Sequence, residues 1–86
     1  MKRRPKTLTA PLVRQLRAVA SEGAPNRIAA ALYLLDRSRV SLADEIGMSQ
    51  QQLGDIMHGR WQSVRLETAR PIAKALGCRI EDLWPE

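Results

Sequence analysis

The chain has 86 residues, 44% hydrophobic and only 3% aromatic, which fits one small domain with an aliphatic core and leaves no room for a second domain. Its single cysteine excludes an internal disulfide and a cysteine-based zinc site, and suits a reducing cytoplasm. The net charge is +5, but four of the fourteen basic residues stand in the first six positions, which leaves ten basic against nine acidic groups in the remainder. Charge alone does not decide whether this basic arm is a solubility tail or binds nucleic acid.

Residues 1–8 are predicted to form a flexible arm, and residues 9–86 a single helical domain. A first helix is predicted over about residues 10–21, because Thr9 can cap it, Pro11 suits its first turn and Gly23 can stop it. No stretch is long and apolar enough to span a bilayer, so we expect a soluble protein of the cytoplasm.

A second helix is predicted after Asn26, which can serve as its cap. Its core stripe has helical spacing and consists of Ile28, Ala31, Leu32 and Leu35. A second apolar face carries Ala30, Tyr33 and Leu34, and its expected partner is the preceding helix or a second subunit.

Two short helices are predicted next, over residues 39–46 and 50–58, joined by a three-residue turn that begins with Gly47. Ser38 caps the first of them. Ser49 caps the second, with Gln52 placed three residues later as in a capping box, and Gly59 ends it. This helix–turn–helix spacing spans about residues 38–59.

The C-terminal third predicts a fifth helix ending at Gly77 and a short final helix or turn. Pro71 leaves two possibilities for the fifth helix. An early start near Ser63 or Arg65, which we favour, puts the proline in the helix interior, whereas a start at Thr68 puts it in the first turn. There is no strand signal, so the predicted fold class is all-α.

The segments "SRVSLADEIGMSQQQLGDIMHGR" and "TARPIAKALGCRIEDLW" together resemble the Cro and phage-repressor type of helix-turn-helix protein, also called the XRE family. The resemblance covers roughly residues 26–84. It implies a five-helix lambda-repressor-like domain, here with an extra N-terminal helix, that binds double-stranded DNA, usually as a dimer on a palindromic operator. Arg37 departs from the pattern, since members often have an apolar residue there.

The resemblance implies that the helix beginning after Ser49 is the recognition helix. Its exposed first turn then carries Gln50, Gln51 and Gln52, and Gln52 has the capping box as its alternative role. A primary amide presents a donor beside an acceptor and so matches the major-groove edge of adenine. Asp55, one turn further, could accept from a cytosine amino group. Gly54 either admits the DNA closely or has no role.

Contacts to the DNA backbone are expected from side chains that flank this helix, by their similarity to the positions that hold phosphate in the family. These residues are Arg39, Ser49, Arg60, Gln62 and Ser63. The basic arm, with Lys2, Arg3, Arg4 and Lys6, could follow a groove or simply be a disordered terminus.

An enzyme is not expected, because the only histidine, His58, and the only cysteine, Cys78, lie in separate helical contexts with no catalytic partners, and no cofactor or metal site is predicted. We expect a prokaryotic or phage-encoded repressor that dimerises on DNA, with RNA polymerase as a possible partner. The alternative is an antitoxin or other protein-interaction module that keeps the helix-turn-helix fold and binds a toxin. The apolar face of the extra N-terminal helix and the two apolar faces of the helix at 26–36 motivate that alternative.

Overall fold

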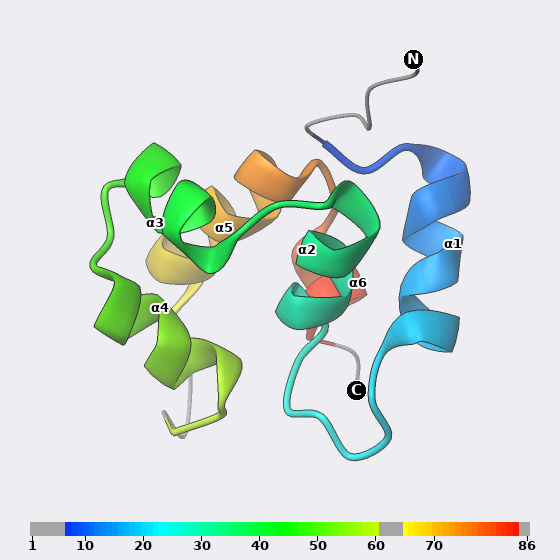
Figure 1. Cartoon of the computed structure of the whole chain (residues 1–86), viewed down its shortest axis with the longest axis horizontal. Coiled ribbons are helices and arrows are strands. Elements are labelled where there is room, and N and C mark those ends of the chain that lie inside the picture. Colours follow the sequence, from blue (N-terminus) through cyan, green and yellow to red (C-terminus); the bar gives the residue numbers. More distant parts are fainter. Residues whose placement is uncertain (1–6, 61–64, 85–86) are drawn as a thin grey trace.

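The computed structural model describes residues 7–60 and 65–84, and these form an all-helical domain of 39 × 27 × 19 Å (Figure 1). Within them there are six helices and no strand. The helices are α1 (Ala10–Val19), α2 (Ile28–Leu35), α3 (Arg39–Ile46), α4 (Gln50–Met57), α5 (Leu66–Leu76) and α6 (Ile80–Leu83).

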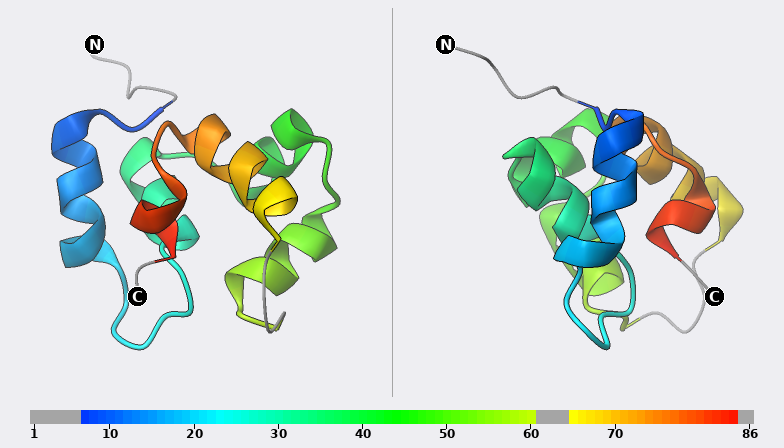
Figure 2. Two further views of the ribbon diagram at one scale, coloured as in Figure 1. Left: turned by 180° about the vertical axis from the view of Figure 1, so that it is seen from behind. Right: turned by 90° about the vertical axis from the view of Figure 1, so that its right-hand side faces the viewer.

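The core is aliphatic and takes side chains from all six helices. Its fully buried large residues are Leu16, Ile28, Leu42, Leu53, Ile56, Ile72, Leu76 and Leu83. The helix α1 packs on α2, and α3 packs on both α4 and α5. In Figure 1 and in the left view of Figure 2, α1 lies at one end of the long axis and the α3–α4 pair at the other.

Four helices end in the same hydrogen-bonded turn, in which a residue with positive φ allows two backbone N–H groups to reach back to the last free carbonyls. After α3, the residue is Gly47 (φ 71°), and the Met48 N–H donates to the Ala43 carbonyl at 2.9 Å. After α2, it is Asp36 (φ 54°), a non-glycine residue of a type that tolerates this conformation. The predicted glycine stops at 47, 59 and 77 are confirmed.

The ends of α1 differ from the prediction. The helix stops at Val19, two residues early, because Ala20 adopts extended backbone (ψ 137°) and leads into the connection that contains Gly23. Thr9 is the N-cap residue, but its side chain makes no capping hydrogen bond.

The predicted arm of residues 1–8 is wrong at its C-terminal boundary. Leu8 is buried in the core, and its N–H donates to the Leu76 carbonyl at 2.7 Å. A Cβ at Gly77 would come within 2.6 Å of the Thr7 Cβ, so the chain here crosses closely over the end of α5. Residue 8 therefore belongs to the domain, because removing the apolar leucine side chain from water stabilises the folded state.

The early start of α5 is confirmed. Arg65 is its N-cap residue, and Pro71 lies inside the helix on its exposed side. Proline has no N–H to donate to the carbonyl four residues earlier, that of Glu67, and solvent can satisfy that carbonyl because Glu67 is exposed. The proline is tolerated because the other face of α5, with Ala69, Ile72 and Leu76, supplies buried apolar surface.

Candidate nucleic-acid interface

The two helices α3 and α4 are connected by Gly47, and each has a serine cap at its N-terminal end. The Ser38 hydroxyl accepts the Ser41 N–H at 3.0 Å, and the Ser49 hydroxyl accepts the Gln52 N–H at 3.1 Å. Between them, Gly47 in the left-handed conformation turns the chain from one helix to the next. Both serine caps and the glycine turn agree with the sequence prediction.

The first turn of α4 presents three consecutive amide side chains to solvent. Gln50, Gln51 and Gln52 are all exposed, while Leu53 and Ile56 on the same helix are fully buried. The buried side holds the helix to the core, so its opposite side and its N-terminal end face outward. Gln52 uses its backbone N–H for the serine cap and keeps its side chain exposed.

Arg39, at the start of α3, is exposed and lies across α4 at Gly54. A Cβ added at Gly54 would stand 2.9 Å from Nη1 of Arg39 and 3.5 Å from Cζ. The glycine therefore leaves room for the guanidinium at the junction of the two helices. The sequence suggested that Gly54 either admits DNA closely or has no role. The contact with Arg39 gives it a role within the protein.

Asp55 and Arg60 form an ion pair, with 3.2 Å between the Asp55 Oδ1 and the Arg60 Nη1. The carboxylate is 28% exposed and the guanidinium 71% exposed. The backbone joins the same residues, because the Arg60 N–H donates to the Asp55 carbonyl at 3.0 Å. The negative charge of Asp55 on this face is thus partly compensated, and the arginine side chain is held next to α4.

His58 closes α4 with its side chain turned back along the helix. Its Nδ1 lies 2.7 Å from the Gly54 carbonyl. The histidine therefore contacts a carbonyl in the last turn of the helix. The described residues contain no cluster of three side chains suited to a metal ion.

Residues 36–84 match the family described as the Cro/C1-type HTH DNA-binding domain, which is more than half of the chain. The chain belongs to this family. Comparison with curated proteins and with solved structures finds no match. None of the helices within the described ranges is of a length and apolarity that would cross a membrane.

The Cro/C1-type segment contains α3, α4, α5 and α6, and therefore every predicted site residue outside the arm. The structure places Arg39, Ser49, the three glutamines, Asp55 and Arg60 on the two helices and their flanks. Gln62 and Ser63, like Trp61, lie outside the described residues, as do Lys2, Arg3, Arg4 and Lys6. The first described residue, Thr7, lies against the C-terminal end of α5 rather than against α4.

Two residues outside the predicted site support it. Arg37, only 11% exposed, bonds Glu45 of α3 at 2.9 Å and the Ala75 carbonyl of α5 at 3.4 Å. Asn26 donates to the Ile56 carbonyl of α4 at 2.8 Å. From the sequence, Arg37 was identified only as unusual for the family, and Asn26 only as a helix cap. Neither observation predicted the distant residues that these two side chains contact.

Proposed function

We propose that this Cro/C1-type domain is a sequence-specific transcriptional regulator that reads double-stranded DNA with the first turn of α4. The observation that carries the proposal is the exposure of Gln50 and Gln51 at the capped N-terminal end of a helix whose other side is buried. In helix-turn-helix proteins, the N-terminal residues of the second helix contact base edges in the major groove.

The glutamine amide is suited to adenine. It accepts from N6 and donates to N7 in a bidentate contact, which contributes about 1–3 kcal/mol of discrimination against the wrong base. Gln51 and Gln50 are the proposed base-reading residues, and Gln52 is a third amide at the same edge. Asp55 is paired with Arg60, so we propose that it orients this arginine, with acceptance from a cytosine amino group as its second role.

Backbone contacts in this proposal come from the two arginines that flank α4. Arg39 lies over Gly54 on one side, and Arg60 follows the helix on the other. Both are exposed, so each can meet a phosphate without losing a buried partner. The Ser49 hydroxyl and the side chains of Gln62 and Ser63 complete the proposed set.

The proposed mode of action is repression by a dimer bound to a palindromic operator. A two-fold dimer would set two copies of α4 into successive major grooves about 34 Å apart. Such occupancy of a promoter excludes the polymerase. The proposed site of action is the nucleoid in the cytoplasm of a prokaryotic or phage-infected cell.

The competing proposal, a module that binds chiefly another protein, loses part of its support in the structure. It depended on the apolar faces of the N-terminal helix and of α2. Leu16 is fully buried, and Leu12, Val13 and Val19 pack against the core, so the domain itself uses most of the apolar face of α1. On α2, the Tyr33 side chain is 70% exposed.

The test is selection of bound duplexes from a random pool with the full chain, followed by sedimentation of the complex. The expected result is one palindromic sequence bound by two chains, with an affinity that falls steeply as salt rises because counterions are released. Failure to enrich any sequence would overturn the proposal. Tight binding to a protein with little dependence on salt would favour the competing module.

A further inference from the structure

The connection between α1 and α2 ends in three residues that contact three distant parts of the chain. These residues, Pro25, Asn26 and Arg27, are called the α1–α2 junction here. The Arg27 N–H donates to the Leu83 carbonyl at the end of α6 at 2.8 Å. A Cβ at Gly59, just after α4, would lie within 2.7 Å of the Pro25 Cβ.

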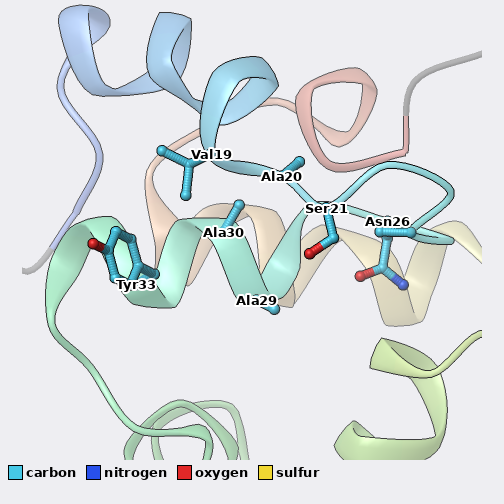
Figure 3. Close-up of a pocket in the computed structure, with 8 residues that line it drawn as sticks. Val19, Ala20, Ser21, Asn26, Ala29, Ala30 and Tyr33 are labelled. Carbon is cyan, nitrogen blue, oxygen red and sulfur yellow. The ribbon is translucent and has the colours of Figure 1, made fainter.

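Asn26, between these two contacts, is a buried polar side chain with 5% exposure. Its Oδ1 accepts the Ile28 N–H at the first turn of α2 (3.2 Å), and its Nδ2 donates to the Ile56 carbonyl in the last turn of α4 (2.8 Å). Figure 3 shows the residue at the edge of a hollow of about 480 Å³, with its carboxamide pointing away from Val19 and Ala20. An amide is suited to this place because it donates and accepts at once.

The helix α4 is therefore attached at both ends. The Ser49 cap and the Gly47 turn hold its N-terminal end to α3, and the α1–α2 junction holds its C-terminal end. Without the attachment at its C-terminal end, the orientation of α4 would depend on its first turn and on the packing of Leu53 and Ile56. A change in this orientation alters the angle at which Gln50 and Gln51 meet a groove. Errors of about 10–20° in orientation are enough to weaken a bidentate contact.

We infer that Asn26 is a positioning residue for α4, although it lies outside the segment 36–84 that matches the family. The inference rests on the proposed function, because it concerns how the base-reading side chains are aimed. Its physical basis is the buried hydrogen bond from Asn26 to Ile56, supported by the packing of Pro25 on Gly59.

Two substitutions separate the two hydrogen bonds of Asn26. Asn26→Asp keeps an acceptor for the Ile28 N–H but removes the donor to Ile56 and sets a carboxylate against that carbonyl. Asn26→Ser also keeps a capping acceptor, without adding charge, but its hydroxyl is too short to replace the longer amide. Val13→Ala on α1 is the matched control, since it removes core packing without touching α4.

The measurement is the ratio of affinities for the selected operator duplex and a scrambled duplex, at a temperature where urea unfolding shows every variant to be folded. Both Asn26 variants are expected to lower this ratio about tenfold, because misaligned glutamines lose part of the discrimination that their base contacts provide. Val13→Ala is expected to leave the ratio unchanged even where it lowers stability equally. An unchanged ratio in a folded Asn26→Ser protein would overturn the inference.

Amide hydrogen exchange separates this inference from the proposed function. If the wild-type protein failed to distinguish the two duplexes, the proposed function would be wrong. Hydrogen exchange at the backbone amides of His58 and Gly59 would still test whether Asn26 holds the C-terminal end of α4. Faster exchange there in Asn26→Ser than in Val13→Ala would support the anchoring role. Equal exchange in the two variants would overturn it.

Discussion

At the scale of single residues, Arg37 shows how one charged side chain joins two helices. Its guanidinium is mostly buried, and it joins Glu45 of α3 to the Ala75 carbonyl near the end of α5. The last turn of a helix has free carbonyls and partial negative charge, which suits a cation. The residue that departs from the family pattern therefore ties the helix pair to the rest of the domain.

Replacing Gln51 with Ala is expected to relax base preference at one position of each half-site. The loss of a bidentate contact should reduce discrimination there by about 1–3 kcal/mol, with little effect on binding to random duplex. Binding to a panel of single-base operator variants measures this. Unaltered preference at all positions would remove Gln51 from the base-reading set.

The Cys78 thiol is expected to react slowly while the protein is folded. Burial, and secondarily the Asp82 carboxylate, raises the pKa of this thiol to about 12, and only the thiolate is a good nucleophile. The folded state binds this proton more tightly than the unfolded chain, so the stability contribution is full below pH about 9 and is lost as the pH rises towards 12.

A disulfide reagent at pH 8, with and without urea, checks the expectation for Cys78. The unfolded chain should react much faster than the folded one. The difference in unfolding free energy between wild type and Cys78→Ala should change between pH 9 and 12. Rapid reaction of the folded protein at pH 8 would contradict the assigned burial.

At the scale of helices, α3 and α4 are joined by a side chain that lies across the second helix rather than by apolar packing alone. Gly54 is an unfavourable residue within a helix, yet it stands where the Arg39 guanidinium passes. The arrangement exchanges some helical propensity for space in which the Arg39 guanidinium can lie beside the proposed DNA-reading turn of α4.

Replacing Gly54 with Ala is expected to lower operator affinity without lowering the stability of the fold. Alanine favours the helix by about 0.8–1.0 kcal/mol, and the new Cβ meets only the flexible end of Arg39, which can move away. The free energy of unfolding should therefore be maintained or raised, while operator affinity falls several-fold. Urea unfolding and operator titration measure the two quantities.

A double-mutant cycle with Arg39→Ala provides the control for Gly54. If alanine acts by displacing the arginine, the two substitutions together should weaken binding no more than Arg39→Ala does alone. Additive losses would mean that Gly54 acts independently of Arg39.

At the scale of the whole molecule, the α3–α4 pair, which carries the proposed base-reading residues, and the N-terminal helix α1 lie at opposite ends of the long axis (Figure 1). The described chain begins against α5, where Thr7 and Leu8 cross Gly77. The extra helix thus extends the core and supplies the α1–α2 junction, whereas the proposed DNA contacts remain with α3 and α4.

Replacing Arg60 with Ala is expected to lower affinity for every duplex alike. Loss of one phosphate contact per chain, and therefore two per bound dimer, should reduce the slope of log affinity against log salt by about 2. Arg17→Ala, an exposed arginine on α1 at the far end, is the matched control and should leave the slope unchanged. Equal slopes in all three proteins would remove Arg60 from the phosphate-binding set.

The sequence by itself determined the local structure of the helix pair. The capping and turn interactions join residues within about five positions of one another, so they can be predicted from the sequence. They are the caps at Ser38 and Ser49, the turn at Gly47 and the helix ends at Gly59 and Gly77. The exposure of Gln50, Gln51 and Gln52, which the family resemblance implied, is present in the structure.

Only the tertiary structure decided which separate surfaces meet. Asn26 and Ile56 are 30 positions apart, and Arg37 and Ala75 are 38 apart. Leu8 joined the core rather than the arm because α5 offers it a place to be buried and a carbonyl to bond. Periodicity gives the face of a helix that packs, but the partner of a buried polar group depends on how the helices are arranged around the common core.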